Sequence, residues 1–155
     1  KGHIEILIKE INKNFDLSFF DNLDFFKKYS SDIYIVSGGF QSIIESVMLS
    51  STNFEWNVFA NELIFNKEDK LVGVNLDNPL AHSLGKVNLI KSLNLKTDII
   101  IVGDGYTDYE IKKHNLAKYF LAYTKHVKRD NVVSNADKIC ANFSQVVKFI
   151  EQNYY

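Results

Sequence analysis

The sequence of 155 residues has a single cysteine, Cys140, and a formal net charge of only −1. One cysteine excludes a disulfide framework and suits a reducing cytoplasm, so we expect Cys140 to be a core residue. The near-neutral net charge shows no excess of basic residues of the kind that binds nucleic acid. No apolar run approaches membrane-spanning length, and the first residues lack the pattern of a signal peptide. We therefore expect a cytoplasmic protein without nucleic-acid or membrane partners. Its function must be argued from a local site and not from its composition.

The composition is that of an ordinary globular protein, with 46% hydrophobic and 24% charged residues. The length is sufficient for one domain with a sizeable core. Helical spacing of apolar residues predicts helices over 3–15, 18–29, 86–93, 109–114 and 143–152. Strands are predicted over 33–36, 99–102 and 119–123, with a short strand or turn over 136–141. This alternation predicts an α/β fold.

The strand over 99–102 is followed by a glycine-rich turn that carries two carboxylates, Asp104 and Asp108. Such a turn lies at the carboxyl end of a parallel sheet, where open α/β sheets bind ligands. Two carboxylates four residues apart across this turn can converge on a hard cation such as Mg²⁺. Alternatively, Asp104 is a turn residue and Asp108 is the N-cap of a helix that begins near Tyr109. The motif alone favours neither interpretation.

The strand over 33–36 is followed by Ser37, Gly38 and Gly39 and then by apolar residues at helical spacing. A hydroxyl group, two accessible backbone N–H groups and the positive end of a helix make an anion site suited to phosphate. In the alternative interpretation, the glycines relieve strain in the turn and Ser37 caps the helix. Taken alone, the stretch slightly favours this alternative.

Two further features interrupt the alternation of strands and helices. Residues 57–75 hold two short apolar runs around a polar turn, which predicts an inserted antiparallel hairpin. Lys86 opens a predicted helix, where a positive charge is unfavourable for the helix dipole, and this suggests a nearby anionic partner. The alternative is a solvated surface lysine.

The order of these motifs resembles the haloacid dehalogenase superfamily, and within it the phosphoserine phosphatase branch. Ser37 matches the second motif, Lys86 the third, and Asp104 with Asp108 the fourth, and the resemblance runs from about 32 to 123. It implies a Rossmann-like parallel sheet with flanking helices. It also implies a single domain over 1–155, with 18–155 as the core. Residues 1–17 would then be the remnant of a cap or linker helix.

The resemblance implies a Mg²⁺-dependent phosphomonoester hydrolase that works through an aspartyl-phosphate, and within that class a phosphoserine phosphatase of serine biosynthesis. It assigns phosphate binding to Ser37, Gly38, Gly39 and Lys86. Lys86 would also neutralise the nucleophile.

For the metal, the resemblance implies Asp104 as a Mg²⁺ ligand, with Asp108 holding a metal-bound water or Lys86. Thr107 stands where many phosphoserine phosphatases have asparagine, which bears on the choice of substrate.

The family's first motif, Asp-x-Asp-x-Thr, supplies the nucleophile and is not found. Asp16, Asp21 and Asp24 lie in or beside predicted helices. In the family the strand that carries this motif lies centrally, between the strands that here are 33–36 and 99–102. We therefore expect the first central strand and most of the helical cap to be absent from this chain, and the chain alone to be inactive. An upstream segment or fused domain would supply them.

Two alternatives stay open for the function. The chain could be a non-catalytic module that keeps the phosphate-binding and metal-binding residues for binding or regulation. It could also belong to a phosphatase of another small phosphorylated metabolite.

Overall fold

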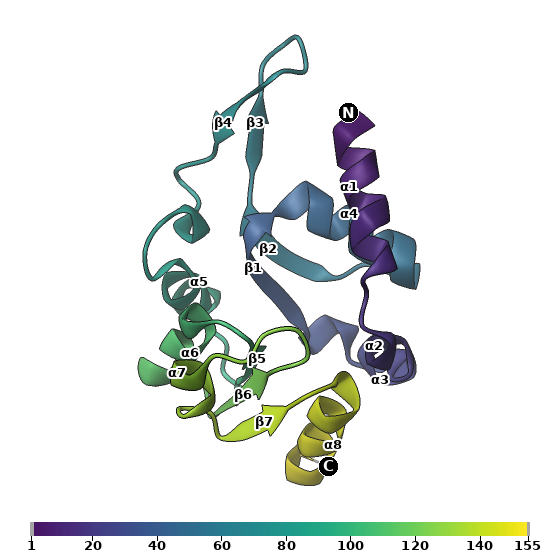
Figure 1. Ribbon diagram of the computed structural model, residues 1–155. Helices are drawn as coiled ribbons and strands as arrows, with labels where there is room; N and C mark the ends of the chain where they lie inside the picture. The colour runs from purple at the N-terminus through teal and green to yellow at the C-terminus, as the bar shows by residue number, and fades with distance from the viewer. Residues whose placement is uncertain (1, 155) are drawn as a thin grey trace. The chain divides into compact units, whose positions relative to one another are not determined.

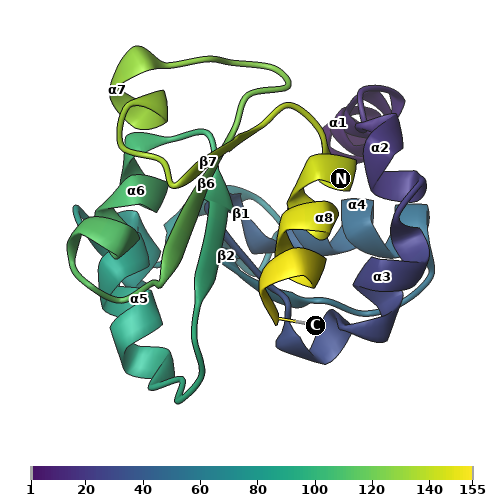
Figure 2. The same cartoon turned by 90° about the horizontal axis from the view of Figure 1, so that it is seen from below.

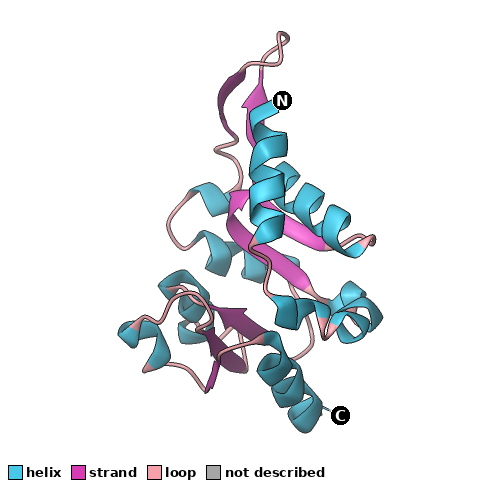
Figure 3. Ribbon diagram, turned by 45° about the vertical axis from the view of Figure 1, so that its right-hand side comes forward, coloured by secondary structure: helices cyan, strands magenta, loops and turns pink. Residues whose placement is uncertain are grey.

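The computed structural model describes residues 2–154, with side chains from residue 6 onward. It divides into two compact units, Lys1–Ser83 and Leu84–Tyr155. Each unit contains parallel strands with helices beside them, which confirms the predicted α/β fold class (Figures 1 and 3). A single domain over 1–155 stays a prediction.

The first unit is built on a parallel strand pair. Strand β1 (Tyr34–Phe40) leads into helix α4 (Gln41–Thr52), which returns the chain to strand β2 (Asn57–Asn61). Tyr34 faces Asn57 at the start of the pairing, and the register shifts before Phe40. The strand extends past the predicted 33–36, so it includes the Ser-Gly-Gly segment.

Three α-helices precede β1 in the described part of the chain. Helix α1 (Gly2–Lys13) agrees with the predicted helix, whereas the predicted helix over 18–29 is two short ones, α2 (Leu17–Phe20) and α3 (Leu23–Lys28). The break falls at Asn22, whose ψ of 20° departs from helical values.

Aromatic side chains of this segment form part of the core. Phe19 and Phe26 are buried and stack with their ring centroids 4.8 Å apart. Trp56, which precedes β2, contacts both rings. The short helices are therefore held by packing more than by their length.

The predicted hairpin over 57–75 is shorter than expected. Residues 57–61 form β2 and pair with β1, and only β3 (Leu63–Phe65) and β4 (Leu71–Val74) form the antiparallel hairpin. The prediction was wrong for 57–61 because a short apolar run looks alike in a hairpin and in a parallel strand. The segments before β1 and after β4 carry short 3₁₀ helices, Ser30–Asp32 and Pro79–Ala81.

The second unit repeats strand and helix along the chain. Its elements are α5 (Gly85–Leu93), β5 (Ile100–Gly103), α6 (Tyr106–Lys113), β6 (Tyr119–Tyr123), α7 (Asp130–Val133), β7 (Lys138–Cys140) and α8 (Phe143–Tyr154). The strands are all parallel, in the order β5-β6-β7. Helix α7 lies between the segments 119–123 and 136–141, in a stretch where the sequence analysis predicts no helix.

Strand β6 is buried on both faces, as a central parallel strand should be. Phe120 packs with Val132 of α7 on one face, and Leu121 packs with Cys140 and Val146 on the other. Figure 2 shows β6 and β7 between α6 and α8. Cys140 is fully buried, so its predicted place in the core is confirmed. Burial raises the pKa of its thiol.

Within residues 2–154, none of the helices has the length and apolar character needed to cross a membrane.

Candidate functional site

The carboxylates of the Gly-Asp-Gly turn are held in different ways. Asp104 directly follows β5, and its side chain is half exposed at 51%. Asp108 lies at the third position of α6 and is buried, and its Oδ2 accepts a hydrogen bond of 3.0 Å from the backbone N–H of Gly105. Helix α6 begins at Tyr106, so the alternative in which Asp108 is the N-cap of a helix near Tyr109 was wrong. Asp108 instead lies inside the first turn of α6, where its side chain accepts a hydrogen bond from a backbone N–H that has no partner within the helix.

Lys86 has the anionic partner that its position at a helix start predicts, and this partner is Asp108. Lys86 lies in the first turn of α5, and its Nζ is 2.6 Å from Oδ1 of Asp108. The side chains are only 18% and 12% exposed, so Lys86 is not a solvated surface lysine. The pair offsets the unfavourable charge at the start of α5. Both oxygens of Asp108 are thereby engaged, one with Lys86 and one with Gly105.

Gly103 makes this arrangement possible by leaving space for Asp108. A Cβ atom at Gly103 would collide with Cβ, Cγ and Oδ2 of Asp108, while one at Gly105 would lie 3.1 Å from Oδ2. The glycine before Asp104 is therefore required for close approach, not for an unusual φ, because none of the glycines in the described chain has a positive φ.

The Ser-Gly-Gly segment lies in the first unit. Ser37 Oγ accepts a 3.0 Å hydrogen bond from the N–H of Gly39, and Gly38 and Gly39 are exposed. Ser37 does not cap α4, whose N-cap is Phe40. The alternative of a cap with strain-relieving glycines was wrong, since neither glycine has a positive φ. Backbone N–H groups next to a helix start remain suited to an anion.

Asn61 is a site residue that the sequence analysis missed. It ends β2, is only 8% exposed, and its Nδ2 donates a 2.9 Å hydrogen bond to the carbonyl of Gly38. Its Oδ1 is buried without a hydrogen-bond partner among the described residues. Asn61 therefore fixes the backbone of the Ser-Gly-Gly segment from the neighbouring strand. The signal in the sequence was a polar residue at the end of an apolar strand.

We expect Asn61→Asp to lower the free energy of unfolding by about 2 kcal/mol, because a buried carboxylate would face the carbonyl of Gly38 and the donor would be lost. Urea unfolding measures this. Asn88→Asp, on the exposed side of α5, is the matched control and should change stability by less than about 0.5 kcal/mol. Equal midpoints for the two variants would show that Asn61 does not hold this segment.

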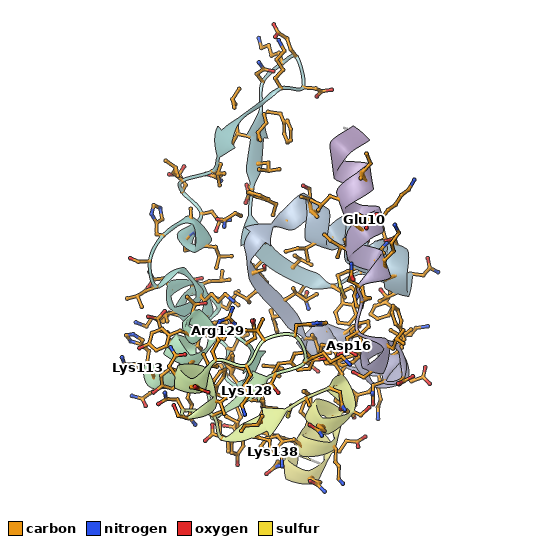
Figure 4. The ribbon with its side chains drawn as sticks, viewed as in Figure 1. Glu10, Asp16, Lys113, Lys128, Arg129 and Lys138 are labelled. Atoms are coloured by element: carbon orange, nitrogen blue, oxygen red, sulfur yellow. The ribbon has the colours of Figure 1, made fainter. Side chains whose placement is uncertain are left out.

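Arg129 is a second residue that the sequence analysis missed. It is the N-cap residue of α7, and its Nη1 lies 2.5 Å from Oδ2 of Asp104 and 2.7 Å from the backbone oxygen of the same residue. Figure 4 labels this side chain. Arg129 lies between the predicted segments 119–123 and 136–141, in a stretch of sequence with no distinguishing pattern.

The donor set suits a magnesium ion bound through few protein ligands. Asp104 offers a half-exposed carboxylate, whereas Asp108 is engaged with Lys86 and Gly105. Between residues 2 and 154, no cluster of three or more His, Cys, Asp or Glu side chains could hold a metal alone. Mg²⁺ commonly keeps several waters and takes only one or two carboxylates together with substrate phosphate, so the residues fit such a site.

The structure thus brings Lys86 and Asp108 into contact, with Asp104 in the same turn. Ser37, Gly38 and Gly39 lie in the other unit. Thr107 is exposed on α6. The roles assigned to these residues stay predictions.

Comparison with known proteins finds phosphoserine phosphatases. The chain is 34% identical over 123 residues to the phosphoserine phosphatases of Bos taurus and of Homo sapiens, covering 77% of this chain and 54% of each relative. It is 29% identical to the chloroplastic phosphoserine phosphatase of Arabidopsis thaliana, covering 42% of that protein. The chain therefore spans about half the length of the curated relatives it matches. No family model matches it.

Among solved structures, a phosphoserine phosphohydrolase-like protein from Francisella tularensis matches with a TM-score of 0.74 and 25% identity, over 92% of this chain and 68% of that one. The structure of DsGPDH from Dunaliella salina matches with a TM-score of 0.62 and 24% identity, over 81% of this chain and 21% of that one, which shows a shared fold.

Proposed function

This chain is a phosphoserine phosphatase-like protein of the haloacid dehalogenase type, and from that premise we propose that the protein carrying it hydrolyses the phosphate ester of phosphoserine. The observation that carries the proposal is the Lys86–Asp108 pair at the carboxyl end of β5. A lysine whose ammonium group is held by a buried carboxylate is a pre-oriented positive charge. Phosphoryl transfer needs such a charge to stabilise the negative charge of its transition state. Hydrolysis of phosphoserine releases serine, so we place the reaction in serine biosynthesis.

In the proposed reaction, a carboxylate oxygen of the nucleophilic aspartate attacks phosphorus, the bond between phosphorus and the seryl oxygen breaks, and the acid of the same Asp-x-Asp-x-Thr motif protonates the seryl oxygen. Water then hydrolyses the aspartyl-phosphate to inorganic phosphate. Lys86 neutralises charge on the phosphoryl oxygens and on the nucleophile, while Asp108 holds its ammonium group in place. The hydroxyl of Ser37 and the N–H group of Gly38 would donate hydrogen bonds to phosphate oxygens, and the N–H group of Gly39, which donates to Ser37 Oγ, would orient that hydroxyl.

Asp104 is the proposed ligand of Mg²⁺. When bound, Mg²⁺ neutralises charge that develops on the phosphoryl oxygens. Asp108 contributes through Lys86 or through a metal-bound water, since both of its oxygens already accept hydrogen bonds from the protein. Thr107, exposed at the start of α6, is proposed to contact the substrate.

The nucleophilic aspartate is proposed to lie outside these 155 residues, so that this chain alone is inactive. Asp16 caps α2 by accepting a 2.9 Å hydrogen bond from the N–H of Ser18, which is a structural role. Asp21 is the C-cap of α2, and Asp24 lies in the first turn of α3. None of these three follows a strand.

The test is phosphate release from phosphoserine by the full-length protein, with Mg²⁺ and with EDTA in its place. We expect turnover that needs Mg²⁺ and falls at least about 100-fold when the metal is removed. The 155-residue chain alone should release no phosphate. Turnover of other phosphorylated metabolites in preference to phosphoserine would keep the reaction and change the substrate. Absence of any phosphatase activity in the full-length protein would contradict the proposal.

A further inference from the structure

Arg129 binds the carboxylate that the proposed function gives to the metal. Its Nη1 donates to Oδ2 of Asp104 at 2.5 Å and to the backbone oxygen of the same residue at 2.7 Å. This double contact ties the chain segment between β6 and α7 to the end of the adjacent strand, β5. Both side chains are about half exposed, at 45% and 51%, so water and ions reach the pair.

A guanidinium group and a divalent cation compete for the same carboxylate. Mg²⁺ coordinates oxygen at about 2.0–2.1 Å, and an oxygen that accepts a short charge-assisted hydrogen bond has that direction occupied. The two positive charges would also repel each other at this distance. Arg129 and a cation therefore cannot both keep their best geometry on Oδ2 of Asp104, and a cation on Oδ1 of the same carboxylate would still be repelled by the guanidinium group.

We propose that Arg129 is an exchangeable counter-ion of Asp104, which holds the carboxylate until a divalent cation displaces it. The inference rests on the proposed function, because that function supplies the cation. Displacement from Oδ2 removes one of the two contacts by which Arg129 anchors this segment, so metal binding at the end of β5 is coupled to the chain before α7. Arg129 is in this sense a positioning residue.

The expected effect is modest, because exposed ion pairs contribute little. A pair of this kind changes an equilibrium by roughly two- to fivefold. Removing Arg129 should therefore tighten binding of the cation to Asp104 by roughly that factor, since the cation no longer has to displace it.

Calorimetric titration of the full-length protein with Mn²⁺ tests this, without a need for turnover. Arg129→Gln should tighten binding by roughly two- to fivefold relative to Lys128→Gln. Lys128 is exposed and adjacent in the sequence, so its variant removes the same charge without breaking the contact to Asp104. Arg129→Lys keeps the charge but loses the planar guanidinium, and should fall between the two.

The outcomes separate this inference from the proposed function. Equal affinities for Arg129→Gln and Lys128→Gln would overturn the inference and leave the metal site intact. Weaker binding in Arg129→Gln would overturn it too, because Arg129 would then support the carboxylate with the metal bound. If the full-length protein binds no Mn²⁺, or if Asp104→Asn leaves its affinity for Mn²⁺ unchanged, the proposed metal site at Asp104 is wrong. This inference is then wrong as well.

Discussion

Lys86→Met should lower kcat/KM of the full-length protein for phosphoserine by roughly 10³-fold, because it removes a fixed positive charge from the transferred phosphoryl group. The same substitution leaves Asp108, whose side chain is 12% exposed, without its partner. We expect the free energy of unfolding to fall by about 2 kcal/mol, less than for a fully buried pair because both side chains keep some contact with water. Steady-state kinetics and urea unfolding measure the two effects separately.

Lys91→Met is the matched control, since Lys91 lies on the same helix and is exposed. It should leave both measurements unchanged within error. Adding Asp108→Leu to Lys86→Met should restore part of the lost stability, because no buried charge is then left unpaired, but should restore no activity. Activity that returned with stability would show that Lys86 is a structural residue and not a catalytic one.

The sequence predicted the elements that periodicity defines. The strand over 99–102, the helix over 143–152 and the α/β class follow from apolar spacing, and the structure has them as β5, α8 and parallel sheets. The anionic partner of Lys86 was also predictable, because a lysine at a helix start is unfavourable without one.

Other features depended on tertiary contacts and could not be predicted. Strand β2 and the hairpin share the same local pattern, so only the pairing with β1 separates them. The break between α2 and α3 falls at Asn22, between Phe19 and Phe26, whose apolar spacing continues across it. Arg129 and Asn61 act on residues 25 and 23 positions away, a distance at which no spacing rule applies.

Gly103→Ala should be at least as damaging as the loss of Lys86, because its Cβ would overlap three atoms of Asp108. Those atoms are the side chain that pairs with Lys86 and caps the first turn of α6. Backbone on one side and a helix start on the other leave Asp108 little room to move, so overpacking should cost about 3 kcal/mol of unfolding free energy. Displacing Asp108 also releases Lys86, and we expect kcat/KM to fall by roughly 10³-fold or more.

Gly73→Ala is the matched control, since a Cβ there meets no atom within 4 Å. It should be neutral within about 0.5 kcal/mol. Gly105→Ala provides an intermediate case, because its Cβ would lie 3.1 Å from Oδ2 of Asp108 and needs only a small adjustment. The three alanine variants should therefore rank in stability by their closeness to Asp108, with Gly103→Ala lowest. A Gly103→Ala protein as stable as Gly73→Ala would mean that Asp108 does not pack against β5, and the fixed Lys86–Asp108 pair would lose its structural basis.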